Sequence, residues 1–207
     1  MGRTSDARSK ILEAAHSIIE RRGYEAMGVA EICKAAGVPK GSFYYFFESK
    51  ENLALAVLDD HWTTERDRWQ RLLGNSKKPP LQRLRQLFRA TAAGLRAGQN
   101  NCGTVSGCLL GNLTLELSNQ TELIRARLQD IFEAQVQMVE IVIAEGQSRG
   151  DVTVRDAHEA ARSVVAQLEG QVLFAKLYNN PRRLDTLWAN SLALLGARPD
   201  EHLTAAH

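Results

Sequence analysis

The sequence predicts an all-α protein of about nine helices, and three observations support this prediction. No segment of the 207 residues shows the alternation of apolar and polar residues that is typical of a β-strand. Apolar residues instead recur three or four positions apart in one segment after another, as on the buried face of a helix. Only five prolines interrupt the chain, and the clearest break is the NSKKPP stretch at residues 75–80.

The first three expected helices are short and closely connected. Apolar residues at three-to-four spacing predict a helix over residues 5–22, and Gly23 ends it. Two shorter helices are expected over residues 29–36 and 40–46. These three helices predict a small N-terminal domain at residues 1–48.

The remaining helices are long enough for a bundle, which we expect to occupy residues 49–207. Ser49 is a capping residue and Glu51 lies in the first turn, so a helix should run from here to about Leu73. Asn119 or Thr121 marks another helix start. The further helices are expected over residues 81–96, 106–117, 121–146, 157–178 and 181–195.

Composition places the chain among ordinary globular proteins and excludes several function classes. Hydrophobic residues make up 44% and charged residues 24%, with a formal net charge of only +2. Any nucleic-acid binding must therefore come from a local basic patch. No apolar run reaches membrane-spanning length, and the start lacks the apolar core of a secretory signal, so we expect a cytoplasmic protein without membrane contact. Three cysteines cannot all pair within one chain.

The most informative segment, residues 29–47, reads VAEICKAAGVPKGSFYYFF. A helix, a tight turn at Gly37 and a second short helix match a helix-turn-helix motif. The second helix carries hydroxyl, aromatic and basic side chains of the kinds that contact phosphates and base edges. A three-helix domain with an incidental basic face is the alternative interpretation. The candidate contact residues are Lys40, Ser42, Tyr44 and Tyr45.

Together with the preceding RRGYEAM, this segment resembles the DNA-binding domain of the TetR/AcrR family of bacterial one-component repressors. The resemblance covers about residues 11–58, and a glycine, Gly28, stands where many members have Ser or Thr. It implies that Tyr44 and Lys50 contact phosphates, that Lys40, Ser42 and Tyr45 read the major groove, and that Arg3 and Thr4 form an arm on the DNA.

The resemblance also implies a homodimer that binds a partly palindromic double-stranded operator and represses transcription. In this family the last two long helices usually form a four-helix interface between subunits. The alternative is that the same apolar residues fill the core of one chain. The candidate interface residues are Leu168, Gly170, Val172, Leu187, Trp188, Leu192 and Leu195.

A small-molecule inducer is expected to bind in a pocket of the helical bundle. Polar residues in apolar surroundings and nearby large aromatic residues are the candidates, although each one taken singly also fits a structural role. These residues are Asn112, Glu116, Gln135, Gln171, Trp62, Trp69 and Phe88.

The segment GTVSGCLLGNL is similar to a subgroup of the family that includes an N-ethylmaleimide-responsive repressor, in which a cysteine senses electrophiles and oxidants. Cys108 is the matching residue. We expect it in the first turn of a helix capped by Ser106 or Gly107, where unpaired amides and the helix dipole favour a thiolate. A small buried hydrophobic role is the alternative for Cys108. Lys176 would favour the thiolate if it lay nearby, and Cys102 is either a resolving thiol or an exposed bystander.

Catalysis and metal binding are not expected. The pair Glu13 and His16 has the spacing found in di-iron bundles, but no second copy is present. No phosphate-binding loop, nucleophile elbow or dinucleotide motif appears, so we expect no enzyme activity and no cofactor. The alternative function is a helical ligand-binding or detoxification protein that does not bind DNA.

Overall fold

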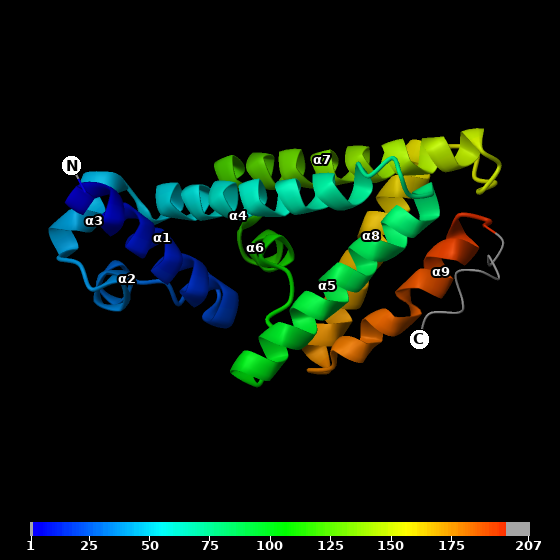
Figure 1. The fold of residues 1–207 in the computed structure, drawn as a ribbon. Coiled ribbons are helices and arrows are strands. Elements are labelled where there is room, and N and C mark those ends of the chain that lie inside the picture. Colours follow the sequence, from blue (N-terminus) through cyan, green and yellow to red (C-terminus); the bar gives the residue numbers. More distant parts are fainter. Residues whose placement is uncertain (1, 198–207) are drawn as a thin grey trace. The chain divides into compact units, whose positions relative to one another are not determined.

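The computed structural model describes the backbone of residues 2–197 and the side chains of residues 6–197. Within that range it contains nine α-helices, one 3-10 helix and no strand, which confirms the all-α prediction (Figure 1). The chain forms two compact units. Unit 1 comprises the residues up to Thr64 together with Cys108–Asp130, and unit 2 comprises Glu65–Gly107 and the residues from Ile131 onward.

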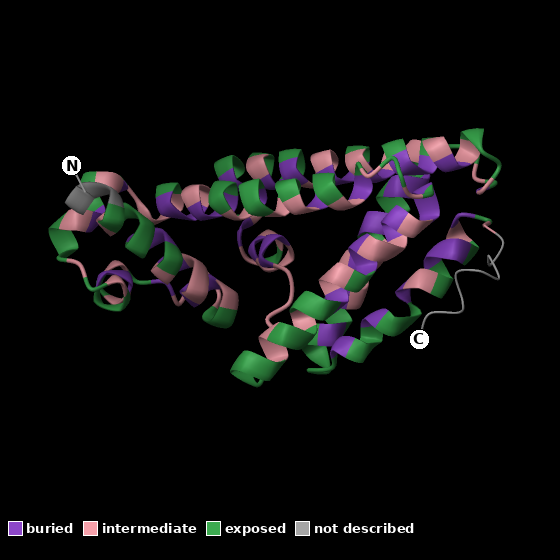
Figure 2. Ribbon diagram, viewed as in Figure 1, coloured by how far each residue is buried: buried purple, intermediate pink, exposed green. Residues whose placement is uncertain are grey.

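Unit 1 contains the expected helix-turn-helix. Its helices are α1 (Gly2–Arg22), α2 (Val29–Ala36), α3 (Lys40–Phe46) and α6 (Leu109–Leu117), together with the first parts of α4 (Lys50–Leu73) and α7 (Glu122–Ser148). The inner faces of these helices are buried (Figure 2), and α1 packs against both α2 and α3. The fully buried side chains include Ile11, Ile19, Met27, Ile32, Phe43 and Leu53.

Two glycines end helices of unit 1 in the left-handed region, as the sequence predicts. Gly23 follows α1 with φ of 83°, and Gly37 follows α2 with φ of 65°. The backbone N–H of Val38 donates to the carbonyl of Cys33 at 3.0 Å, which closes the turn between α2 and α3. A side chain at either φ value would be strained, so glycine is required at these two turns.

The predicted start signals of α4 and α7 are confirmed. The Ser49 hydroxyl accepts the Asn52 backbone N–H at 3.0 Å, and the Thr121 hydroxyl accepts that of Ile124 at 3.2 Å.

The division into compact units does not coincide with the expected domain boundary after residue 48. The first part of α4 and the start of α7 both lie in unit 1, where Arg127 pairs with Asp59 at 2.7 Å.

Unit 2 consists of the second parts of α4 and α7, α5 (Pro80–Cys102), α8 (Ala157–Leu177), a 3-10 helix η1 (Pro181–Thr186) and α9 (Leu187–Leu194). Helices α8 and α9 pack against each other and against η1, and α5 contacts both η1 and α9. Asp156 caps α8 by accepting the backbone N–H of Glu159 at 3.0 Å.

Three expected elements differ from the structure. Helix α5 extends to Cys102, because the polar stretch before it continues the helix until Gly103 takes φ of 76°. Helix α6 begins at Leu109 rather than at residue 106, because Gly107 has φ of 87° and cannot belong to a right-handed helix. The last expected helix is divided into η1 and α9.

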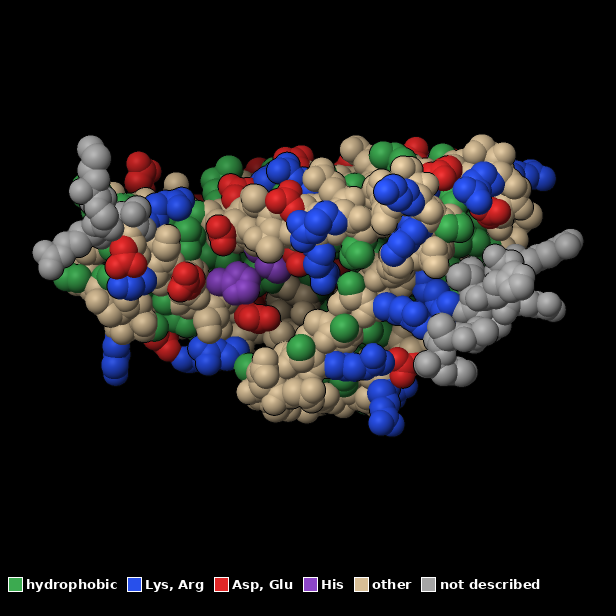
Figure 3. Space-filling view, in the orientation of Figure 1, with side chains coloured by type: hydrophobic (Ala, Val, Ile, Leu, Met, Phe, Trp, Pro, Cys, Tyr) green, Lys and Arg blue, Asp and Glu red, His purple; other side chains and the backbone are tan. Residues whose placement is uncertain are grey.

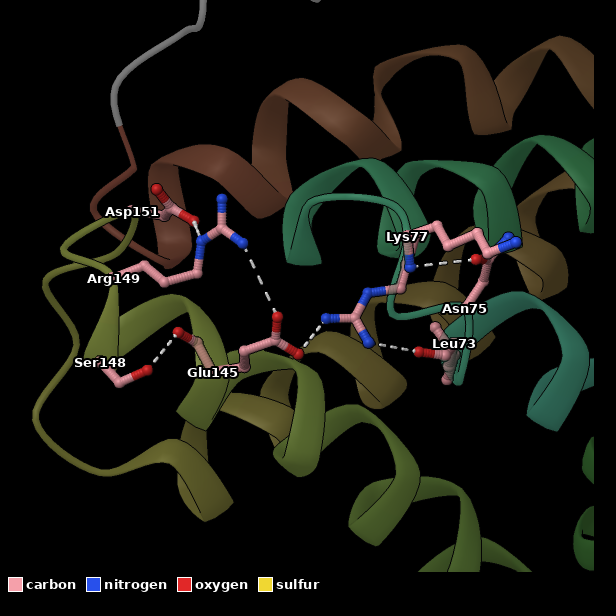
Figure 4. Close-up of polar contacts among 8 residues, drawn as sticks. Leu73, Asn75, Lys77, Glu145, Ser148, Arg149 and Asp151 are labelled. Carbon is pink, nitrogen blue, oxygen red and sulfur yellow. Dashed lines mark hydrogen bonds and ion pairs between the residues drawn. The ribbon is translucent and has the colours of Figure 1, made fainter.

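A buried arginine fixes the end of α4 within unit 2. Arg83 of α5 is only 3% exposed, and it donates to the carbonyl of Leu73 at 2.8 Å and to the carboxylate of Glu145 on α7. Figure 4 shows that Glu145 also faces Arg149, which in turn pairs with Asp151 at 3.1 Å. Because a buried guanidinium without a counter-charge is costly, this network holds three helices of the unit at one point.

Within the described part of the chain, no helix is long and apolar enough to cross a membrane.

Candidate functional site

Helix α3 presents an exposed aromatic surface because its other face is occupied by the core. Phe43 and Phe47 are buried four residues apart, which directs the intervening Tyr44 and Tyr45 outward with 57% and 73% of their surface exposed. The Tyr44 ring packs edge-on against Phe43, with 5.2 Å between the ring centroids. Two adjacent exposed tyrosines on a short, well-packed helix form a rigid surface for a planar or polar partner.

Basic and hydroxyl groups lie beside the tyrosines on the same helix. Lys40 is exposed at the start of α3 and Ser42 is half-buried. Burial raises the pKa of the Cys33 thiol, an effect that nearby Lys40 partly opposes, so Cys33 is a packing residue of the motif rather than a reactive one. This surface therefore offers a cation, a hydroxyl and two phenols.

Lys50 lies at the other end of the motif, at the start of α4. Its Nζ is 3.9 Å from the centroid of the Tyr24 ring, which is a cation–π contact. The Tyr24 backbone N–H donates to Glu116 of α6 at 2.6 Å. Burial, and then the carboxylates of Glu51 and Glu25, raise the pKa of Tyr24, so its phenol stays neutral.

Two other predicted DNA contacts cannot be placed by their side chains. The side chains of Arg3 and Thr4 lie outside the described residues, and only their backbone is assigned, in the first turns of α1.

The start of α2 lacks the usual side-chain cap. Gly28 occupies the N-cap position with φ of −86° and ψ of 142°, and no side-chain cap bond is present there. A Cβ built at Gly28 would meet nothing within 4 Å. The site therefore has the conformation and the space for a capping serine.

Cys108 is the N-cap of α6 rather than a residue of its first turn, so Ser106 and Gly107 do not cap the helix as expected. Its carbonyl accepts the Asn112 N–H at 2.9 Å, and its half-buried thiol forms no disulfide. The thiol makes no capping hydrogen bond with the first-turn amides. Part of the Cys108 side chain is exposed.

Asn179 fixes the loop that precedes Cys108. It has φ of 47°, its side-chain oxygen accepts the Val105 N–H at 2.8 Å, and its side-chain nitrogen donates to the carbonyl of Gly103 at 3.1 Å. Cys102 is exposed at the end of α5, at the start of this loop. The sequence analysis did not identify this role of Asn179. The available signal was its place just after the expected end of a helix, where asparagine often adopts the left-handed conformation.

The expected pocket residues have different environments. In unit 2, Gln135 is 4% exposed and its Oε1 accepts no hydrogen bond, and Phe88 is buried edge-on against Trp188. The carboxylate of Glu116 is bound to Tyr24 and therefore has a structural role at the motif. The other candidates divide between the units: Trp62 and Asn112 lie in unit 1, and Trp69, Gln171 and Lys176 lie in unit 2.

Most of the predicted interface residues are already used by the core of one chain. Leu168, Val172, Leu187, Leu192 and Leu195 are buried within the single chain, whereas Gly170 and Trp188 are half-buried. The five leucine and valine side chains therefore have little surface left for a partner.

An exposed apolar face lies on α8 that sequence reasoning missed. Leu173, Phe174, Leu177 and Tyr178 are between 47% and 69% exposed. Their spacing of four residues in two adjacent rows was the available signal, because such rows share one side of a helix. The Phe174 and Tyr178 rings stack with 6.3 Å between centroids, so the face is continuous.

In the pair Glu13 and His16, which has the spacing found in di-iron bundles, the histidine contacts another histidine. His16 Nε2 lies 3.3 Å from His61 Nδ1, which joins α1 to α4, and histidine side chains gather at one place on the face in Figure 3. Among the described residues, no three His, Cys, Asp or Glu side chains are grouped so that they could hold a metal ion.

Comparisons with known proteins agree with this geometry. Residues 11–57 match the family model of bacterial regulatory proteins of the tetR family, and residues 80–190 match that of the tetracyclin repressor-like C-terminal domain. The chain is 34% identical to the transcriptional repressor DhaR of Mycobacterium sp. over 186 residues, which are 89% of each chain. It is 32% identical to the repressor NemR of Escherichia coli over 59% of this chain and 60% of that relative.

Solved structures give the same result. A regulatory protein TetR from Rhodobacter sphaeroides is similar with a TM-score of 0.81 and 30% identity, covering 89% of this chain and 96% of the other. The reduced form of E. coli NemR is similar with a TM-score of 0.83 and 26% identity, covering 94% and 100%.

Replacement of Gly28 tests the empty cap. Gly28→Ser is expected to be more stable than Gly28→Ala by about 1 kcal/mol, because only serine accepts an N–H of the first turn. Both variants share the loss of glycine flexibility, so their difference isolates the cap. Urea denaturation measures it, and an alanine variant as stable as the serine variant would contradict the assignment.

Proposed function

This chain belongs to the TetR family of bacterial regulatory proteins, and we propose that it is a repressor that binds a partly palindromic operator as a homodimer. That it is a transcriptional regulator follows from the family. Repression, the operator contacts, the dimer and the signal are the parts that we propose here. Its relatives are regulators, so the proposal includes no catalytic step.

The exposed face of α3 is the observation that carries the proposal. Tyr44, Tyr45 and Lys40 offer phenols and a cation on a rigid helix, which suits contacts to phosphates and to base edges in a major groove. Lys50 adds a phosphate contact at the start of α4. The detoxification alternative leaves this aromatic and basic face without a purpose.

The α8 face is the proposed interface of the dimer. Leu173, Phe174, Leu177 and Tyr178 together expose a large apolar area, which single soluble chains rarely leave uncovered. A second copy of the chain is the proposed partner, because subunits of this family pair through their last long helices. A two-fold symmetric dimer presents one α3 helix from each subunit, as a partly palindromic operator requires.

We consider two signals for release of the operator. In the first, the Cys108 thiolate adds to the carbon–carbon double bond of an electrophile and water protonates the adjacent carbon, or hypochlorous acid oxidises the thiolate to a sulfenic acid with release of chloride. The modified residue favours a state that binds DNA weakly. The partial exposure of this thiol and its absence from any disulfide support this, and the solved NemR structure is named as a reduced form. In the second, a small molecule with a hydrogen-bond donor binds noncovalently, supported by the unpaired Oε1 of Gln135. Either signal must bind the two states unequally.

The regulator proposal is tested with DNA that flanks the chain's own gene. Fluorescence anisotropy should show a specific complex that weakens steeply with salt, because several phosphates are neutralised in each half-site. Tyr45→Ala should weaken it by about 5- to 100-fold through loss of a base contact. The control is Leu123→Ala, which should leave binding unchanged, because Leu123 is also an exposed apolar residue of unit 1 but lies on α7. Absence of a salt-sensitive specific complex for the wild type would contradict the proposal.

The dimer is tested by charge on the α8 face. Phe174→Glu combined with Leu177→Glu should give a monomer in light-scattering measurements, because apposed carboxylates cannot be desolvated in an interface. The matched control is Ile141→Glu, since Ile141 is 68% exposed on α7 outside this face and should leave the dimer intact. A dimer that persists in the double variant would exclude α8 as the interface.

Cysteine variants separate the two signals. N-ethylmaleimide should release wild-type protein and Cys102→Ser from the operator, and it should not release Cys108→Ser. Release of Cys108→Ser to the same extent would rule out this thiol as the sensor. Cys102→Ser is the matched control, because it removes an exposed thiol close to Cys108 in the sequence and leaves Cys108 in place.

A further inference from the structure

Three elements of unit 1 meet at Tyr24, in the turn that follows α1. Its backbone N–H donates to Glu116 near the end of α6, and its ring lies 3.9 Å beneath the Nζ of Lys50 at the start of α4. One residue therefore contacts α6 through its backbone and α4 through its side chain.

The backbone at this point leaves little room for another arrangement. Gly23 has φ of 83°, and a Cβ there would lie 2.2 Å from an oxygen of Glu116. The turn requires glycine because of this φ, and a side chain there would displace the Glu116 carboxylate from its present position. The Glu116 carboxylate fits closely against the turn that carries Tyr24.

The Tyr24 ring restricts a side chain that is otherwise flexible. Lysine has four rotatable bonds and pays an entropic cost when it is fixed on a phosphate. The neighbouring carboxylate of Glu51 accepts the hydroxyl of Thr121 at the start of α7, and no Lys50 ion pair is present among the described residues. The ring face is therefore the contact that holds the Lys50 ammonium in place.

We infer that Tyr24 is a positioning residue that orients Lys50 for the DNA backbone, and that Glu116 sets the position of Tyr24. This inference rests on the proposed DNA-binding function and adds a route by which α6 controls one of its contacts. A shift of α6 moves the Glu116 carboxylate, the turn at Tyr24 follows, and Lys50 loses its oriented ammonium while α3 stays folded.

The route begins at the candidate sensor. Cys108 is the N-cap of α6 and Glu116 is its eighth helical residue, so one short helix of about 12 Å joins them. A chemical change at the thiol therefore acts on the same rigid element as the bond to Tyr24.

The contact itself can be measured without DNA. In protein labelled with carbon-13 lysine, the Lys50 ε-CH2 signal should be shifted upfield by the Tyr24 ring, with Lys50→Arg used for its assignment. The shift should persist in Tyr24→Phe, vanish in Tyr24→Leu, and decrease in Glu116→Leu. Glu122→Gln is the matched control, because Glu122 is an exposed carboxylate of the same unit that pairs with Arg125.

The effect on binding is measured with a double-mutant cycle on the flanking DNA. Tyr24→Leu should weaken binding about threefold for each subunit, as expected for an exposed cation–π contact. It should have no further effect in a Lys50→Ala background, and each variant should reduce the salt slope by at most about 2 per dimer. Tyr24→Phe should bind as the wild type does.

Two results would overturn the inference: an unchanged Lys50 signal in Tyr24→Leu, or equal weakening by Tyr24→Leu with and without Lys50. If wild-type protein forms no specific complex, the proposed function fails, and the Lys50 signal alone decides whether Glu116 and Tyr24 position this side chain.

Discussion

The burial of Phe43 and Phe47 is the constraint on which the functional surface depends. Helix α3 has only seven residues, and these two rings anchor one side of it and its C-cap in the core of unit 1. The exposed positions of the helix carry the tyrosines and the lysine of the proposed DNA contact. Helix α3 also packs against α1 and α2, so the same core joins all three helices of the motif.

Local signals in the sequence predicted the helices well, because caps and left-handed glycines act within one turn. Ser49, Thr121 and Gly37 have the roles that their residue types predict. The prediction was less accurate where the outcome depends on distant partners. Glu116 has the composition of a pocket residue, but its carboxylate is bound 92 positions earlier in the chain, at Tyr24.

The same limit explains the interface residues. Leu187 and Leu195 belong to strongly apolar segments, and the sequence alone left open whether such segments face a partner or the core. The 3-10 helix before α9 and its packing on α8 bury both side chains within one chain. The apolar side chains that remain exposed are those of the α8 face, which begins at Leu173. This face could be recognised only after the core was known.

The central claim is that two α3 helices of a homodimer read one operator, and hydroxyl-radical footprinting of the wild-type complex tests it most directly. We predict two protected patches of equal size on one face of the duplex, related by a dyad, with centres one helical turn or a whole multiple of it apart. A single protected patch, or uniform protection that does not depend on sequence, would contradict the account.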